Sequence, residues 1–228
     1  MFSFLRIKSM ASSCWSRTRI NSFWGLVISL GLGSIPMKAA VVVWDDGGGN
    51  DNWNTAANWN PNGTPGSGDT VSFDADDFVA GTMSIDLNGS NRTVNEVIFG
   101  AATTVGNFDF TSNQLRIGAG GLTNSDDQQQ RFQNVRLESN QTWDLSGNIL
   151  IDNNLIIRRN LTINGDGRLD VNNRLQLGGN RTLTYNSTAT ALIDILRLNG
   201  AKLTLAGTGD IDVQQTLQNH NGDRELQN

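Results

Sequence analysis

Apolar and polar residues alternate in short runs over most of the chain, and similar tripeptides return about every 20 residues. One series consists of LRI (115–117), VRL (135–137), LII (155–157), LQL (175–177) and LRL (196–198). Alternation with a period of two is typical of half-buried β-strands, whose first and third residues face the core. A repeat of this length that persists over many units indicates a solenoid with one coil per repeat.

Three such series run in parallel, so we expect three short strands in each coil. Extended back to Val97 and forward to Leu217, the first series predicts an internal column of Val97, Ile117, Leu137, Ile157, Leu177 and Leu198. The second series is Trp143, Ile163, Tyr185 and Leu205, and the third is Phe110, Phe132, Ile151, Val171, Ile195 and Val213. The sequence therefore predicts an all-β protein, a parallel β-helix (β-solenoid) of about six to seven coils over residues 85–217.

A leader precedes the repeat. Residues 1–40 hold five basic residues, no acidic one, and an apolar run at 23–35. Basic residues followed by a short apolar run predict a signal peptide that is cut near Ala40, and an uncleaved N-terminal anchor is the alternative. The chain then divides into a signal peptide (1–40), an N-terminal cap with the first strands (41–84), the β-helix (85–217) and a polar tail (218–228).

The net charge of the chain after the leader limits the kinds of partner that it can bind. All 22 acidic residues but only 12 of the 17 basic ones follow the leader, so the net charge of residues 41–228 is 12 − 22 = −10. A nucleic-acid-binding protein needs a basic face, so we expect no nucleic acid as a partner. We expect no membrane span after removal of the leader. The single cysteine, Cys14, lies in the leader, so no disulfide is expected in the remaining chain.

Three passages resemble a known family. They are NWNTAANWNPNGTPGSGDTVSF, LRIGAGGLTNSDDQQQRFQNVRLESNQTWDLSG and GAKLTLAGTGDIDV. They are similar to exported bacterial proteins with autotransporter-associated β-strand repeats. The resemblance implies a passenger-like β-helix that is secreted or held at the cell surface or outer membrane of a bacterium, with a structural or adhesin-like role. It does not identify a ligand.

The segment 41–73 stands where a solenoid needs a cap over its first coil. Trp44, Trp53 and Trp59 could cover the core there, and DTVSF (69–73) would form the first regular strand. Two alternatives are a sugar-binding platform built from the same tryptophans and a calcium loop. The calcium ligands would be Asp45, Asp46 and Asp51, helped by neighbouring asparagines. Calcium is the one cofactor that the sequence suggests.

Carboxylates are the main candidates for chemistry, because the single histidine, His220, lies in the polar tail. Asp170, Asp194 and Asp212 occupy equivalent outward positions of the third series, so they predict a ligand-binding column of like charges that repel one another. Such a column could serve a polysaccharide lyase or glycoside hydrolase, but acid/base catalysis needs two carboxylates in unlike environments. Arginines form a second outward series at Arg116, Arg136 and Arg197.

Two functions follow from these residues. The first is a non-enzymatic exported or cell-surface protein that contacts neighbouring surface proteins or an extracellular polysaccharide. The alternative is a carbohydrate-active β-helix that binds or cleaves such a polysaccharide. The C-terminal end of the stack predicts a further contact, because the residues after Leu217 include a single apolar side chain, Leu226. We expect either more coils or end-to-end self-association at that end.

Overall fold

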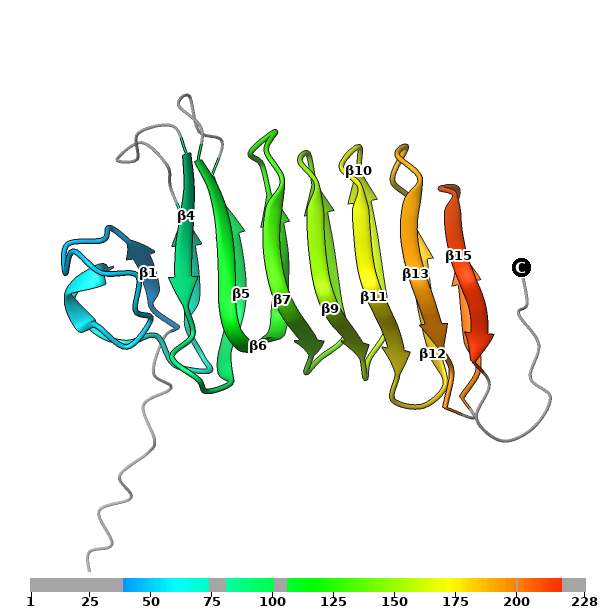
Figure 1. Cartoon of the computed structure of the whole chain (residues 1–228), viewed down its shortest axis with the longest axis horizontal. Helices are drawn as coiled ribbons and strands as arrows, with labels where there is room; N and C mark the ends of the chain where they lie inside the picture. The colour runs from blue at the N-terminus through cyan, green and yellow to red at the C-terminus, as the bar shows by residue number, and fades with distance from the viewer. Residues whose placement is uncertain (1–38, 74–80, 101–105, 200, 219–228) are drawn as a thin grey trace, which may run out of the picture. The chain divides into compact units, whose positions relative to one another are not determined.

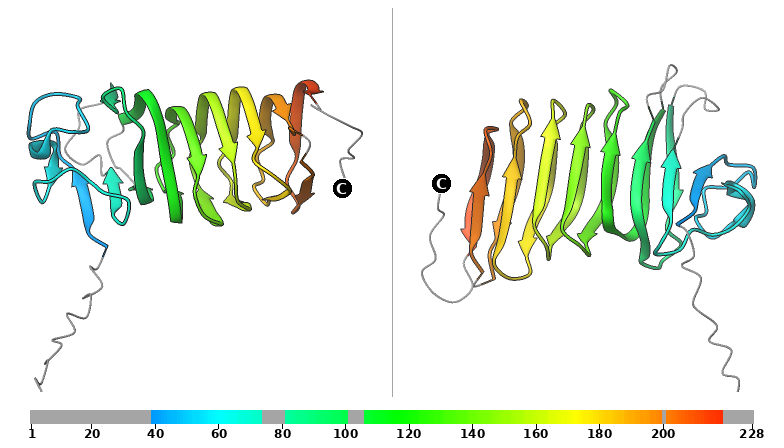
Figure 2. Two further views of the ribbon diagram at one scale, coloured as in Figure 1. Left: turned by 90° about the horizontal axis from the view of Figure 1, so that it is seen from below. Right: turned by 180° about the vertical axis from the view of Figure 1, so that it is seen from behind.

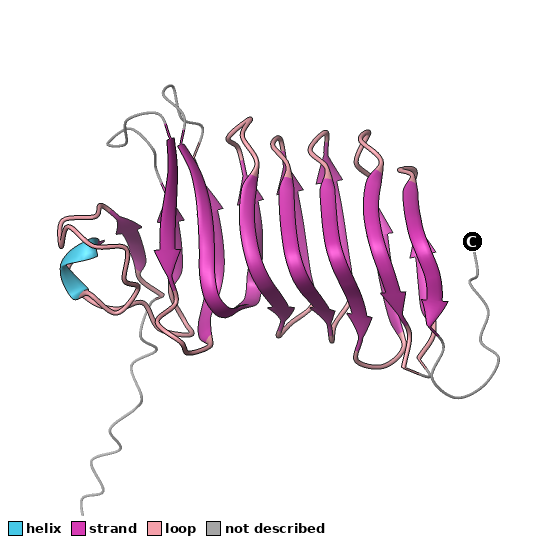
Figure 3. Ribbon diagram, in the orientation of Figure 1, coloured by secondary structure: helices cyan, strands magenta, loops and turns pink. Residues whose placement is uncertain are grey.

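A computed structural model describes residues 39–73, 81–100, 106–199 and 201–218. The predicted signal peptide and polar tail lie almost wholly outside these residues. The described part is an all-β parallel solenoid, as predicted, with its coils stacked along one axis (Figure 1). One short 3₁₀ helix, η1 (Ala56–Asn58), interrupts the strands near the N-terminal end (Figure 3).

Residues 41–73 contribute three short strands, β1 (Val41–Trp44), β2 (Trp59–Asn60) and β3 (Thr70–Phe73). The coils are built from β4 (Gly81–Asp86), β5 (Arg92–Phe99), β6 (Gly106–Asn124), β7 (Gln130–Leu137), β8 (Gln141–Leu145), β9 (Ile149–Ile157), β10 (Leu161–Gly165), β11 (Leu169–Leu177), β12 (Arg181–Tyr185), β13 (Ala191–Arg197), β14 (Leu203–Ala206) and β15 (Ile211–Gln218).

Three parallel faces enclose the core. A register irregularity divides each long strand into two parts, as between Val171 and Arg174 in β11. The first parts stack as face A, from β4 through β6, β7, β9, β11 and β13 to β15. The second parts stack as face B. Face C consists of β1, β3, the ends of β5 and β6, and then β8, β10, β12 and β14. The coils lie side by side (Figure 2). Face A has seven strands, which agrees with the prediction of about six to seven coils.

Most of the predicted internal columns are correct. Ile117, Leu137, Ile157, Leu177 and Leu198 follow one another on face B, and each side chain is at most 1 % exposed. The extension to Val97 is wrong, because Val94 pairs with Ile117. Val97 lies on face C between Val71 and Leu122. The structure does not describe the side chain of Leu217, so the forward extension of the column stays a prediction.

In two further places the predicted register between neighbouring coils is wrong by two residues. On face A, Val171 pairs with Ile193 and not with Ile195. On face C, Leu205 pairs with Leu183 and not with Tyr185. Both errors share a cause, since a shift of two residues leaves the alternation of inward and outward side chains unchanged. The apolar pattern therefore fits either register.

The core changes in character along the stack. Aromatic rings fill its N-terminal coils, where Phe110 and Phe132 stack with ring centroids 4.6 Å apart and Phe73 lies 5.4 Å from Phe99. Leucine, isoleucine and valine fill most of the later coils. The apolar core is thus continuous along the described coils, and the inward side chains of faces A, B and C all pack in it.

Asparagine ladders connect successive coils outside the core. The amide of Asn164 donates to Asp144 Oδ1 (2.9 Å), and that of Asn186 donates to Asn164 Oδ1 (3.0 Å). At the turn from face B to face C, Asn140 and Asn160 accept backbone N–H groups one coil later, those of Asn160 and Thr182. Several of the 28 asparagines thus hold one coil to the next.

Candidate functional site

The three N-terminal tryptophans lie inside the cap. Trp44 is 1 % exposed, and Trp53 and Trp59 are fully buried. Their rings meet edge to face, with centroids 5.0 Å apart for Trp44 and Trp59 and 4.7 Å apart for Trp53 and Trp59. A sugar-binding platform needs exposed ring faces, so this interpretation of the three tryptophans is wrong. The three tryptophans cover the first coil instead. DTVSF contains β3 and is not the first strand, because β1 precedes it.

An amide organises the loop that carries the predicted calcium ligands. The fully buried Asn58 accepts the Gly48 N–H through Oδ1 (2.9 Å), and its Nδ2 donates to the carbonyls of Asn50 (2.6 Å) and Asn52 (2.9 Å). The side-chain oxygens of Asn50 and Asn52 accept groups of the same loop. These oxygens, which a cation would need, already have partners inside the protein.

The acidic residues of this loop lie near one another. Asp45 Oδ1 accepts the Gly47 N–H at 3.0 Å. Burial, with the nearby charges of Asp51 and Asp45, raises the pKa of the Asp46 carboxyl. Within the described ranges, no group of three or more His, Cys, Asp or Glu side chains is placed to hold a metal ion. Calcium at Asp45, Asp46 and Asp51 stays a prediction.

The predicted column of Asp170, Asp194 and Asp212 does not form. On face A, Asp170 pairs with Leu150 on one side and Leu192 on the other, and Leu192 pairs with Asp212. Asp194 lies two residues beyond that row. The reason is the 22-residue step from Val171 to Ile193, which brings a leucine between the two carboxylates. The expected repulsion between neighbouring coils therefore has no structural basis.

Asp170 and Asp194 nevertheless share a shallow hollow of about 290 Å³, whose lining also includes Arg168, Asn172, Leu192 and Gln214. Asp170 is only 6 % exposed, and its Oδ2 lies 2.7 Å from Arg168 Nη2 in an ion pair. Its Oδ1 is buried without a hydrogen-bond donor among the described residues. Burial raises the pKa of this carboxyl, and the Arg168 guanidinium opposes the shift in part. Asp194 is less buried, so the two carboxyls differ in environment.

Arginines gather at the turn from face B to face C. Arg136, Arg158, Arg159 and Arg181 line a hollow of about 220 Å³ together with Glu138 and Gly178. Of the arginines that the sequence singled out, Arg116 and Arg136 are register partners on adjacent coils, whereas Arg197 lies three coils beyond Arg136. The sequence reasoning missed the turn arginines. The Arg-Arg pair at 158–159, directly after LII, is the signal that could have found them.

Comparison with protein-family models, curated proteins and solved structures found no match to this chain. Among the described residues, no helix has the length and apolar character that crossing a bilayer requires.

Proposed function

We propose that this chain is a non-enzymatic, exported β-solenoid that acts as a binding scaffold at or beyond the cell surface, in the manner of an adhesin-like passenger segment. The observation that carries the proposal is the coil-to-coil bonding of its outer polar side chains. Asn134, Asn154 and Arg174 form one such chain, with Asn154 Nδ2 at 2.9 Å from Asn134 Oδ1 and Arg174 Nη2 at 2.7 Å from Asn154 Oδ1.

Fixed side chains favour recognition. Binding usually costs the entropy of ordering loops and long side chains, and a surface that is already ordered avoids part of this cost. A regular stack also presents the same spacing, ~4.8 Å, from coil to coil, which suits a partner that is itself repetitive. The leader-like N-terminal sequence and the resemblance to exported repeat proteins support a location outside the cell.

A carbohydrate-active role is the second candidate, and the unlike environments of Asp170 and Asp194 favour it. A buried carboxyl with a raised pKa, such as that of Asp170, can act as a general acid beside a second, more exposed carboxyl. The Arg168 ion pair weakens this role, because it favours the ionised form of Asp170.

One experiment separates the two candidates. The purified protein is incubated with a panel of extracellular polysaccharides, and both retention on the polysaccharide and the release of reducing ends are measured. A binding scaffold retains at least one polymer and releases no reducing ends. Release of reducing ends that is lost in Asp170→Asn or Asp194→Asn would show the enzyme instead.

A further inference from the structure

We propose that the arginine cluster at the turn from face B to face C, formed by Arg136, Arg158, Arg159 and Arg181, binds the carboxylates of an acidic polysaccharide. The inference rests on the proposed scaffold function and names its partner. The cluster spans successive coils, because Arg136 is the second-last residue of β7, the pair 158–159 follows β9, and Arg181 begins β12. These arginines are distant in sequence but line one hollow.

Positive charge in this cluster is largely uncompensated. Glu138 is the one acidic residue that lines the hollow, and it is shared between Arg136 (3.1 Å) and Arg116 (3.8 Å) on the neighbouring coil. Arg158 is exposed and makes no hydrogen bond or ion pair with any described residue. Four arginines thus surround the hollow against one carboxylate, in a chain whose overall net charge is −5.

Backbone groups hold two of these guanidinium groups in place. Arg181 donates through Nη1 to the Asn180 carbonyl (2.7 Å) and through Nη2 to the Gly178 carbonyl (3.2 Å), and its buried Nε has no partner among the described residues. Arg159 Nε donates to the Glu138 carbonyl at 3.3 Å. Neutral carbonyls fix the side chains without cancelling their charge, which is what an anion-binding site requires.

Gly178 leaves the space that Arg158 occupies. A Cβ atom at this position would lie 2.9 Å from Arg158 Cγ, so a larger residue would displace the arginine side chain. Leu177 ends β11 directly before it. The residue that follows the strand in one coil therefore makes room for the arginine of the previous coil.

The site favours an acidic polysaccharide over a nucleic acid for two reasons. Single-stranded nucleic acids bind through bases stacked on exposed aromatic rings, whereas the tryptophan, tyrosine and phenylalanine rings whose burial the structure describes are in the core. Duplex DNA carries one charge per ~1.7 Å, and the acidic remainder of this chain repels such a density. A polysaccharide with one carboxylate per sugar is less highly charged, and it offers regular anions to guanidinium groups on successive coils.

The test uses polygalacturonate as the acidic probe and dextran as the neutral one, with binding measured by biolayer interferometry at several salt concentrations. We expect the parent protein to bind polygalacturonate with an affinity that falls as salt rises, and not to bind dextran. The double variant Arg158→Gln/Arg159→Gln should lose about tenfold or more in affinity, since each charge-assisted bond contributes substantially. The matched control Arg131→Gln/Arg197→Gln removes the same charge from two arginines outside the hollow and should change the affinity little.

A variant that gains affinity shows that the loss of binding in the double variant is not caused by misfolding. Glu138→Gln removes the one carboxylate of the hollow and should raise the affinity for polygalacturonate, an effect that unfolding cannot produce. Equal losses in the two double variants, no gain from Glu138→Gln, or equal affinity for single-stranded DNA would overturn the inference.

Failure of the inference can be told apart from failure of the proposed function. Retention on another polymer or on cell surfaces without binding to polygalacturonate would overturn the arginine site and leave the scaffold function standing. Shortening of polygalacturonate by the parent, measured by size-exclusion chromatography, would overturn the non-enzymatic function. The arginine site would stand in that case if the double variants still differed as expected.

Discussion

The side-chain amide of Asn58 lies at the centre of the N-terminal loop and holds its backbone together by hydrogen bonds. Its Oδ1 and Nδ2 bind three backbone groups of the surrounding loop, those of Gly48, Asn50 and Asn52. Glycines make this close approach possible, since a Cβ at Gly48 would collide with the Asn58 amide oxygen. The loop in turn positions Trp53 and Trp59 over the first coil, where Trp59 Nε1 donates to the Trp53 carbonyl (2.9 Å).

Replacing Asn58 should therefore loosen the cap. Asn58→Leu keeps a similar volume but leaves the Gly48 N–H and two carbonyls without their partner, at a cost of ~1–3 kcal/mol for each group that stays buried. We expect a lower melting temperature and a red shift of the tryptophan emission as water reaches the cap. The control is Asn54→Ala in the same loop, an exposed side chain for which a loss of similar size would contradict this role of Asn58.

Asp170 should make stability depend on pH. Burial raises its folded pKa above the ordinary value of 3.8, against the partial opposition of Arg168, and Asp194 lines the same hollow. In the interval above pH 3.8 the folded state therefore binds more protons than the unfolded state, so this contribution to stability is present at lower pH and is lost as pH rises through the folded pKa.

The comparison of the parent with Asp170→Asn isolates this contribution. The free energy of unfolding of the parent, relative to that of the variant, should fall between pH 3.8 and neutral pH. Urea denaturation at several pH values measures it. A constant difference across this interval would show that the Asp170 carboxyl titrates alike in the folded and unfolded states.

At the scale of strands, the alternation of apolar residues predicted the three faces and most of their inward side chains. It could not fix the register where two choices differ by two residues. The sequence LIDI (192–195) offers both Ile193 and Ile195 as the inward residue, and backbone pairing selects Ile193. The error in register carried over to the site, because it created the apparent column of aspartates. The arginine cluster was missed for a related reason, since the pair 158–159 at its centre lies in a turn, where the strand period gives no information.

The inward assignment on face B can be tested with two adjacent residues of β11. Leu177 is 1 % exposed in the core, whereas Gln176 beside it faces outward and is half-buried. Leu177→Asp places an unpaired carboxyl in the apolar column, which should lower the free energy of unfolding by several kcal/mol. Gln176→Asp adds the same charge outside and should cost less than about 1 kcal/mol. Chemical denaturation of both variants gives the comparison, and equal stabilities would contradict the assignment.

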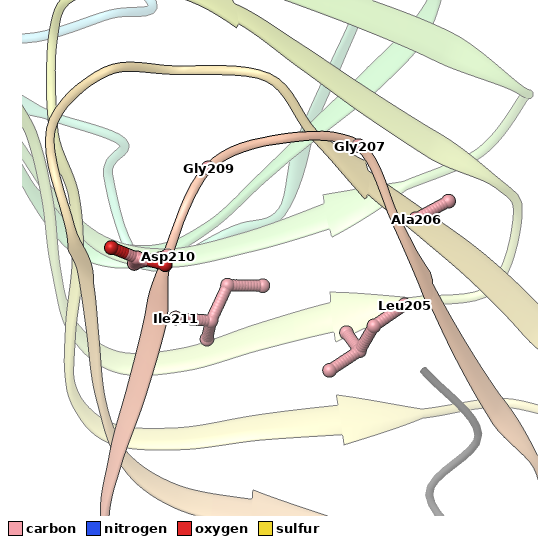
Figure 4. A pocket seen from close by; sticks show the side chains of 6 residues that line it. All are labelled: Leu205, Ala206, Gly207, Gly209, Asp210 and Ile211. Atoms are coloured by element: carbon pink, nitrogen blue, oxygen red, sulfur yellow. The ribbon is translucent and has the colours of Figure 1, made fainter.

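The two ends of the stack differ at the scale of the whole solenoid. At the N-terminal end, β2 covers the outer edge of β1 with a strand of two residues, and Pro61, which has no N–H group, follows it. Short edges and prolines discourage pairing with another chain. At the other end, within the described residues, β14 pairs only with β12 and β15 only with β13. The half-buried side chains of Leu205 and Ile211 lie there beside a hollow of about 410 Å³ (Figure 4).

This asymmetry predicts association through one end only. An exposed parallel edge can pair with the same edge of a second copy. At the opposite end β2 covers β1, and the backbone of Asp51 and Trp53 bonds to Asp86 at the end of β4, so we expect the contact to close as a tail-to-tail dimer rather than to extend into a fibre. Leu205→Lys places a charge at the open end and should shift the protein to a monomer in sedimentation velocity measured over a range of concentrations. Val41→Lys makes the same kind of change at the opposite end, where Val41 is 59 % exposed, and should leave the dimer intact. A parent protein that stays monomeric at every concentration, or a dimer that both lysines disrupt equally, would contradict pairing through β14 and β15.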